Sequence, residues 1–129
     1  MSVKKHISTN KAPSAIGAYS QAVLINNFLF ISGQIPLVPS TMDIISTDFN
    51  KQINQVFENL SNIMTASDGA LSDIVKLNVY LKNLENFQHV NDSMNKYFTE
   101  PFPARAAVEV SRLPKDVEIE IDAIAYIKN

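Results

Sequence analysis

Cysteine is absent from this sequence of 129 residues. Disulfide bonds, thiolate metal sites and cysteine nucleophiles are therefore all excluded. Long apolar runs are also missing, because the uninterrupted ones, such as 22–25 and 28–31, are far too short to cross a bilayer. No signal-peptide core follows the start of the sequence. We therefore expect a protein with neither a membrane segment nor a secretion signal.

Basic charge is scarce as well. The formal net charge is -2, and the longest basic run is Lys4-Lys5. Nucleic-acid-binding proteins usually carry a patch or stripe of basic residues, which this sequence lacks, so nucleic acid is not an expected partner. No acidic residue precedes Asp43, a property shared with organelle transit peptides, but the same region has no arginine and contains strand patterns. The expected location is the cytoplasm, with a mitochondrial one left open.

The composition that remains is that of one globular domain. Hydrophobic residues make up 46% and charged residues 19% of the sequence, which is typical of folded and not of disordered chains. A chain of this length buries roughly two-thirds of the surface that its unfolded form exposes, enough for a single core. We expect residues 1–129 to form one domain.

The beginning of the chain has the pattern of a β-hairpin. Apolar runs at 21–25 and 28–32 flank Asn26-Asn27, and asparagine tolerates the left-handed conformations of a two-residue turn. The polar segment 1–14 either adds an edge strand or frays.

The middle of the chain alternates between helix and strand patterns. Apolar residues recur at helical spacing from about 48 to 64, and Ser46 or Thr47 is the expected N-cap. Strict alternation over 74–82 predicts a strand, and Asn83 is the expected cap of a second helix that ends near Phe98. The apolar face of that strand is expected to comprise Val75, Leu77, Val79 and Leu81.

Two C-terminal segments, 104–110 and 117–127, alternate with the period of strands. The resulting order predicts an α+β fold, a mixed sheet with two helices on one face. The other face then has no cover from this chain and includes Tyr80, Ile124 or Tyr126, so a partner subunit is the economical way to bury it.

The C-terminal segments also carry the candidate chemistry. If they pair as an antiparallel hairpin, Arg105 lies opposite Asp122 and diagonal to Glu120, above the small side chain of Ala107. Arginine binds a carboxylate with two parallel hydrogen bonds, and a nearby glutamate can handle a proton or a water. On pattern alone, a solvated face with ordinary cross-strand ion pairs is the commoner explanation, and the register is a hypothesis.

Four other residues are candidates for lining a site. Gly17 permits a sharp turn that presents Tyr19 at a fixed place. Ser32 and Gly33 end a strand, where backbone amides are available to a ligand. Asn91 lies at the margin of the second helix's apolar side. Each also has a plain structural explanation: a strand tyrosine, strand termination and a helix-surface amide.

Together these motifs closely resemble the RidA family, also called YjgF, from about Lys4 to Tyr126 in the same order and spacing. The motifs that carry the resemblance are Ile16-Gly17-Ala18-Tyr19-Ser20-Gln21-Ala22, Phe30-Ile31-Ser32-Gly33-Gln34-Ile35-Pro36, Val75-Lys76-Leu77, Pro101-Phe102-Pro103-Ala104-Arg105 and Val110 to Ala125.

The resemblance implies a chorismate-mutase-like fold in a homotrimer with clefts between neighbouring subunits. It implies hydrolysis of 2-imino acids or their enamine tautomers, 2-iminobutanoate and 2-iminopropanoate, to 2-oxo acids and ammonia, without a cofactor. In this chain Arg105 would bind the substrate carboxylate and Glu120 would position or activate water. Tyr19, Ser32, Gly33 and Asn91 would line the cleft, and the backbone of Ala107 would face the imine nitrogen.

The sequence departs from the family pattern at three places. Many relatives have cysteine at position 107, where this chain has Ala107, so a thiol mechanism is impossible here. Ala18 replaces a common proline before the tyrosine, and Thr41-Met42-Asp43 replaces a usual Thr-Gly turn. None of these changes removes the arginine and the glutamate.

Two other functions compete with hydrolysis. One is a non-catalytic module that binds a small carboxylate metabolite or a regulatory protein, since a fold alone does not imply turnover. Glu120 beside Arg105 argues against it, because anion binding gains nothing from a nearby carboxylate. The other is a ribonuclease acting as a translation inhibitor, which the missing basic patch and the lack of a histidine pair suited to RNA cleavage argue against.

Overall fold

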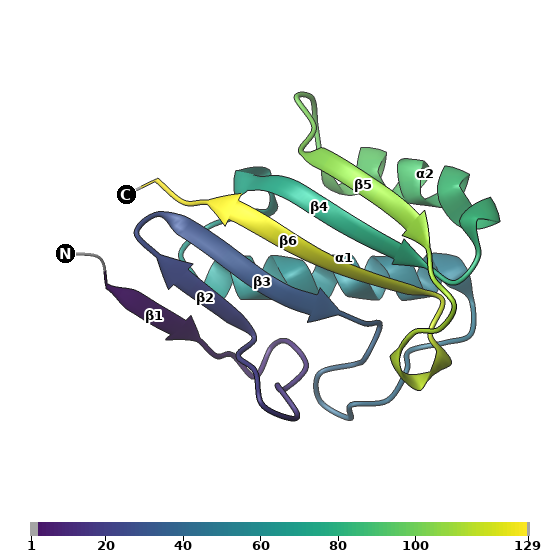
Figure 1. Cartoon of the computed structure of the whole chain (residues 1–129), viewed down its shortest axis with the longest axis horizontal. Coiled ribbons are helices and arrows are strands. Elements are labelled where there is room, and N and C mark those ends of the chain that lie inside the picture. Colours follow the sequence, from purple (N-terminus) through teal and green to yellow (C-terminus); the bar gives the residue numbers. More distant parts are fainter. Residues whose placement is uncertain (1–2, 129) are drawn as a thin grey trace.

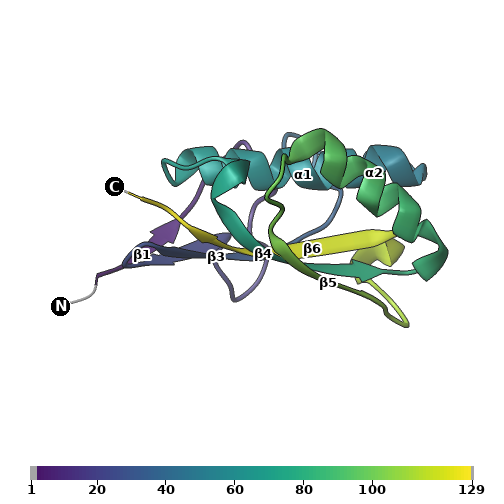
Figure 2. The same cartoon turned by 90° about the horizontal axis from the view of Figure 1, so that it is seen from above.

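A computed structural model describes residues 3–128, which form one six-stranded sheet with two helices packed on one of its faces (Figures 1 and 2). The strands are β1 (Lys4–Ile7), β2 (Ala22–Ile25), β3 (Phe28–Gln34), β4 (Ile74–Leu81), β5 (Ala104–Glu109) and β6 (Ile119–Tyr126). The helices are α1 (Phe49–Ala66) and α2 (Phe87–Tyr97), with short 3-10 helices at Leu71–Asp73, Leu84–Asn86 and Pro114–Asp116.

The predicted hairpin between β2 and β3 is confirmed. The strands pair antiparallel, and Asn26 adopts the left-handed conformation of its turn with φ 52°. Of the two alternatives for the N-terminal segment, the edge strand is correct, because β1 pairs antiparallel with β2.

Helix α1 buries the predicted stripe. Ile53, Val56, Phe57 and Leu60 have no exposed surface and lie between the helix and the sheet. The predicted caps Ser46 and Thr47 are wrong, because the Asp48 side chain accepts the hydrogen bond from the backbone N–H of Lys51. Ser46 instead accepts a hydrogen bond from the backbone of Asp48 and so supports the cap from outside the helix.

Helix α2 begins later than predicted. The Asn83 side chain accepts a hydrogen bond from the backbone of Glu85 and caps the 3-10 helix Leu84–Asn86, not an α-helix. The regular helix starts at Phe87. Phe87 is therefore in the first turn and remains partly exposed.

The predicted hairpin between the last two strands is wrong. The strand order is β1-β2-β3-β6-β4-β5, so β6 lies between β3 and β4 and pairs antiparallel with both. Strand β5 pairs only with β4, in parallel, and forms one edge of the sheet (Figure 1). This order is consistent with burial, because alternate residues of β6 are buried whereas every residue of β5 is at least partly exposed.

The two faces of the sheet differ in cover. The helix-covered face carries the core, and the prediction that residues 117–127 bury one alternating set is confirmed. The opposite face, which we call the uncovered face, exposes Phe28, Phe30, Val108 and Tyr126 by 40% or more. Tyr80, Ile124 and Tyr126 lie on this face, as predicted.

The predicted place of Val75 on the core side is wrong. The pairing of β4 with β6 shifts register between Ile74 and Lys76, which is the irregularity expected of a β-bulge. Ile74 is therefore buried, and Val75 is 44% exposed.

Candidate active site

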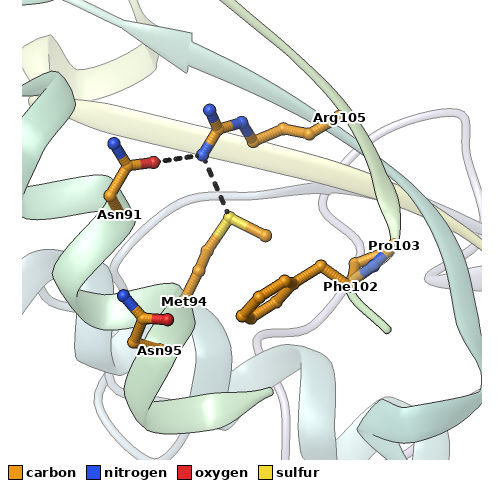
Figure 3. Close-up of a pocket in the computed structure, with 6 residues that line it drawn as sticks. All are labelled: Asn91, Met94, Asn95, Phe102, Pro103 and Arg105. Atoms are coloured by element: carbon orange, nitrogen blue, oxygen red, sulfur yellow. Dashed lines mark hydrogen bonds between the residues drawn. The ribbon is translucent and has the colours of Figure 1, made fainter. Parts of the chain in front are cut away.

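The guanidinium of Arg105 lies against helix α2, at the edge of an open pocket (Figure 3). Its Nη1 donates to Asn91 Oδ1 at 2.6 Å and to Met94 Sδ at 3.4 Å. The ring of Phe87 lies 4.8 Å from the guanidinium carbon, within the range of a cation–π contact. The pocket has a volume of about 530 Å³ and is lined by Asn91, Met94, Asn95, Phe102, Pro103 and Arg105.

The strand register directs Arg105 toward this pocket. Arg105 pairs with Leu77 on β4, and Leu77 is fully buried under the helices. Arg105 therefore projects on the helix-covered face, where α2 supplies its contacts. Ala107 lies two residues further along β5 on the same face and packs, half-buried, against the core. Phe102, held between two prolines, forms another wall of the pocket (Figure 3).

Glu120 lies on the uncovered face, where it pairs with Tyr80 of β4. Its carboxylate lies directly against the backbone of Gly33, because a Cβ built on Gly33 would overlap a carboxylate oxygen. This contact occurs where β3 and β6 shift register between Ile31 and Gln34. The bulge and the missing side chain together allow the carboxylate to approach the strand so closely.

The surroundings of Glu120 favour its protonated form. Partial burial, and secondarily the Asp122 carboxylate, raise the pKa of Glu120 above its ordinary value. Asp122 accepts hydrogen bonds from Asn78 Nδ2 at 2.8 Å and from the Tyr80 hydroxyl at 2.9 Å. The hydrogen bond to Asp122 is the main reason that the pKa of Tyr80 is also raised. A carboxylate whose pKa is raised is a stronger base and takes a proton from water more readily.

Tyr19 and Ser32 lie near Gly33 but have local hydrogen bonds. The Ser32 hydroxyl donates to the backbone carbonyl of Ser20 at 2.6 Å, and the Tyr19 hydroxyl accepts from the backbone of Ile16 at 3.3 Å. Tyr19 and Gly33 line a second pocket of about 260 Å³. Gly17 has φ 118°, which confirms the predicted sharp turn before Tyr19.

The predicted pairing of Arg105 with Asp122 and Glu120 is wrong. Strand β4 separates β5 from β6, and Arg105 projects on the helix-covered face whereas Glu120 and Asp122 project on the uncovered face. The candidate residues thus form two groups in one chain. Arg105 and Asn91 are in contact at α2, with Ala107 on the same face, whereas Glu120, Gly33, Tyr19 and Ser32 lie around the end of β3.

The contacts of Phe87 and Met94 with Arg105 were not foreseen from the sequence. Both residues are apolar, and only their spacing of i, i+4 and i+7 with Asn91 indicates a shared face. The hydrogen bonds of Asp122 with Asn78 and Tyr80 were missed for another reason, because they depend on the register between β4 and β6.

Within residues 3–128, no group of three or more His, Asp or Glu side chains is placed to hold a metal ion. None of the helices in that range is long and apolar enough to span a membrane.

Comparisons with known proteins agree on one family. The family model described as "Endoribonuclease L-PSP" matches residues 9–127. The chain is 40% identical over 128 residues to 2-iminobutanoate/2-iminopropanoate deaminase of Dermatophagoides farinae, covering 99% of this chain and 100% of that protein. It is similar to the crystal structure of RidA from the Antarctic bacterium Psychrobacter sp. PAMC 21119, with a TM-score of 0.92, 46% identity and coverage of 95% and 99%. It is also similar to E. coli TdcF with bound serine, with a TM-score of 0.91, 39% identity and coverage of 96% and 99%.

Proposed function

Because this chain belongs to the RidA (YjgF) family and has its chorismate-mutase-like fold, we propose that it hydrolyses 2-iminobutanoate and 2-iminopropanoate, or their enamine tautomers. The products are 2-oxo acids and ammonia. The observation that carries the proposal is the placement of Arg105: its guanidinium contacts α2 on one side and borders an open pocket. A relative that bears the name of this deaminase, and another that is described with bound serine, support a small substrate with a carboxylate.

Arg105 supplies the carboxylate anchor. A guanidinium binds a carboxylate through two parallel N–H groups, which fixes both the position and the plane of a small acid. The carbon of a protonated imine is already electrophilic. Orientation and one proton-transfer group therefore supply most of what the reaction needs.

Glu120 acts as the proton-transfer group. Its carboxylate takes a proton from a water molecule while the water oxygen bonds to the imine carbon, and the π electrons of the C=N bond move to nitrogen. The proton then passes from Glu120 to that nitrogen. Glu120 removes the hydroxyl proton as the C–N bond breaks and then passes it to the departing ammonia, which leaves the 2-oxo acid, an ammonium ion and the Glu120 carboxylate. The raised pKa of Glu120 suits both directions of transfer.

The two groups meet between copies of the chain. Arg105 and Glu120 project from opposite faces of one sheet, so a single small substrate reaches both only if neighbouring subunits contribute one each. The apolar side chains of the uncovered face, Phe28, Phe30, Val108 and Tyr126, give a reason for association. We propose the homotrimer with three clefts that the family resemblance implies, with the backbone of Ala107 facing the imine nitrogen and Tyr19, Ser32 and Gly33 lining the cleft.

A direct test generates 2-iminobutanoate with a dehydratase and follows its decay. The parent should accelerate decay, whereas Arg105→Ala and Glu120→Ala should lose at least about 100-fold in rate. Arg112→Ala and Glu85→Ala are matched controls, because both side chains are exposed and lie outside the candidate site. Decay catalysed equally well by Arg105→Ala would contradict the anchor.

A mixing experiment tests the shared cleft. Arg105→Ala and Glu120→Ala subunits should each be nearly inactive alone, but a mixed trimer assembled from both would contain a cleft with one intact Arg105 and one intact Glu120. Refolding the two variants together should restore part of the activity. No recovery in verified mixed trimers would contradict a site built from two subunits.

The competing functions give different results in the same assays. A non-catalytic carboxylate-binding module would bind 2-oxobutanoate through Arg105 but would not accelerate imine decay. A ribonuclease would cleave RNA, and the family description names that activity. His6 lies on the edge strand β1 and His89 on α2, so the two histidines of this chain do not form a cleavage pair within one subunit.

A further inference from the structure

Three side chains of α2 contact the same guanidinium. Phe87, Asn91 and Met94 are spaced i, i+4 and i+7, so they lie along one face of the helix. Phe87 places its ring 4.8 Å from the guanidinium carbon of Arg105, Asn91 accepts a hydrogen bond, and Met94 offers its sulfur. Figure 3 shows Asn91 and Met94 approaching the same nitrogen of Arg105.

These contacts use one end of the guanidinium selectively. Both polar contacts go to Nη1, from Asn91 Oδ1 at 2.6 Å and Met94 Sδ at 3.4 Å. A guanidinium has five N–H groups, two of them on Nη1. Among residues 3–128, no other side chain or carbonyl accepts a hydrogen bond from Nε or Nη2 of Arg105. The N–H groups of Nε and Nη2 point the same way and form a fork that matches the two oxygens of a carboxylate.

We propose that Phe87, Asn91 and Met94 are positioning residues that make the Nε–Nη2 edge of Arg105 the carboxylate-binding edge. The proposal deepens the proposed function, since it specifies how the substrate is gripped, and it concerns carboxylate binding before any hydrolysis. The other fork of the side chain, between Nη1 and Nη2, is closed because Asn91 and Met94 occupy Nη1. The ligand class is a small acid with a free carboxylate, and the corresponding amide lacks the second acceptor oxygen.

Each of the three residues has a separate physical role. Asn91 fixes rotation about the end of the side chain, because its carbonyl oxygen accepts a short hydrogen bond from the charged donor. Phe87 holds the guanidinium by a cation–π contact, with the guanidinium carbon 4.8 Å from the centroid of its ring. Met94 is almost fully buried and supplies a second acceptor, its sulfur, to Nη1. Arginine has many rotamers, so a side chain held in this way loses less freedom when it binds a ligand.

Nuclear magnetic resonance of the full ¹⁵N-labelled protein tests the edge directly. Arg105 and Arg112 are the two arginines of the sequence, so their Nε–H signals form a site and an internal control. Titration with 2-oxobutanoate should shift the Arg105 signal and leave the Arg112 signal in place, and 2-oxobutanamide should shift neither. An Arg105 Nε–H signal that does not move at saturating 2-oxobutanoate would overturn the proposal.

Variants of the helix face test the positioning role. Asn91→Ala should weaken 2-oxobutanoate binding about tenfold, as expected for loss of a charge-assisted hydrogen bond. Met94→Leu keeps a similar apolar volume but loses the sulfur acceptor, and it should weaken binding about two- to threefold. Gln88→Ala is the matched control, because it removes a surface amide hydrogen bond to Asp92 on the same helix. Unchanged affinity in a folded Asn91→Ala protein would overturn the assignment.

Kinetics separate positioning from general loss of structure. In the imine assay Asn91→Ala should raise KM about tenfold while kcat changes less than about threefold, because the anchor acts in ground and transition states alike. In an Arg105→Lys background, which lacks the fork, Asn91→Ala should add less than a twofold effect. If the proposed function is wrong, 2-oxobutanoate still shifts the Arg105 Nε–H signal, but the protein does not accelerate imine decay. If the protein accelerates imine decay but 2-oxobutanoate does not shift the Arg105 Nε–H signal, the proposed function stands and only the assignment of the Nε–Nη2 edge is wrong.

Discussion

The carboxylate of Glu120 fills the space that a side chain at position 33 would need. A Cβ on Gly33 would overlap a carboxylate oxygen and would lie 2.9 Å from Glu120 Cδ. Because this contact sits at the register shift between β3 and β6, the glycine determines how closely the carboxylate approaches the strand. The position of the proposed proton-transfer group therefore depends on a residue without a side chain.

Gly33→Ala should displace the Glu120 carboxylate and lower kcat for imine hydrolysis by about 10- to 100-fold, as expected for a misplacement of around 1 Å. The KM should change much less, because the three atoms nearest to the added Cβ all belong to Glu120 and none to the carboxylate anchor Arg105. Steady-state kinetics with 2-iminobutanoate measures both constants. Gly69→Ala is the control: its new Cβ would press on Asp73 and Met64 and reduce stability, but it touches no candidate site residue. Parent-like kcat in Gly33→Ala would contradict the role of this contact.

The pH dependence of stability should reveal Glu120. Its pKa is raised in the folded chain by burial and by Asp122, so folding disfavours the charged form. The contribution of Glu120 to the free energy of unfolding is therefore fully present at pH values below the unfolded pKa of this carboxyl. It is lost as the pH rises through the folded pKa. Glu120→Gln mimics the protonated form. It should therefore be more stable than the parent at pH 7 to 8, and the difference should vanish below about pH 4.

Urea denaturation at several pH values measures this difference. Glu85→Gln is the control, since it makes the same substitution at an exposed carboxyl outside the β6 region. A Glu120→Gln protein that is less stable than the parent at pH 8 would show that the charged carboxylate is stabilised in the folded state, contrary to the prediction.

Most elements could be predicted because local patterns determine them. The stripe of α1 and the alternation in residues 117–127 each specify a buried face without reference to any other element. Asn26-Asn27 specifies its turn in the same way. The errors at the caps of α1 and α2 are also local, because several neighbouring Ser, Thr, Asn and Asp residues can each accept the capping hydrogen bond.

The place of β6 in the sheet could not be predicted from adjacency in the sequence. Strands that follow one another usually pair, but β6 inserts between β3 and β4, where both of its edges are hydrogen-bonded. That single topological difference changes the relation of Arg105 to Glu120 from neighbours to opposite faces. The motif resemblance identified both residues. Their placement on opposite faces of the sheet, and the contacts of Arg105 with α2, could be found only from the three-dimensional structure.

Asn59 stabilises the connection that follows β3. It is fully buried on α1, and its Nδ2 donates to the carbonyl of Leu37 at 3.0 Å and, more weakly, to that of Ile35. Asn59→Ala should leave a buried carbonyl without a partner and reduce the free energy of unfolding by about 1–3 kcal/mol. Asn62→Ala is the matched control on the same helix. Its hydrogen bond to the carbonyl of Lys11 is exposed, so the loss should be below about 1 kcal/mol. Equal losses in urea denaturation would contradict the role of burial.

Phe30 tests whether the uncovered face joins subunits. It is 46% exposed in the single chain and lies in register with Ile124 of β6. Phe30→Asp should fold, since the side chain is not in the core, but it should sediment as a monomer, because a buried carboxylate without a partner opposes association. Imine hydrolysis should then fall at least about tenfold at equal chain concentration, because a monomer cannot bring Arg105 and Glu120 to one substrate. Leu84→Asp is the control: it places the same charge on an exposed apolar residue of the 3-10 helix before α2, outside the uncovered face. A monomeric Phe30→Asp protein with full activity would mean that one chain suffices, whereas an active trimer would move the interface to another surface.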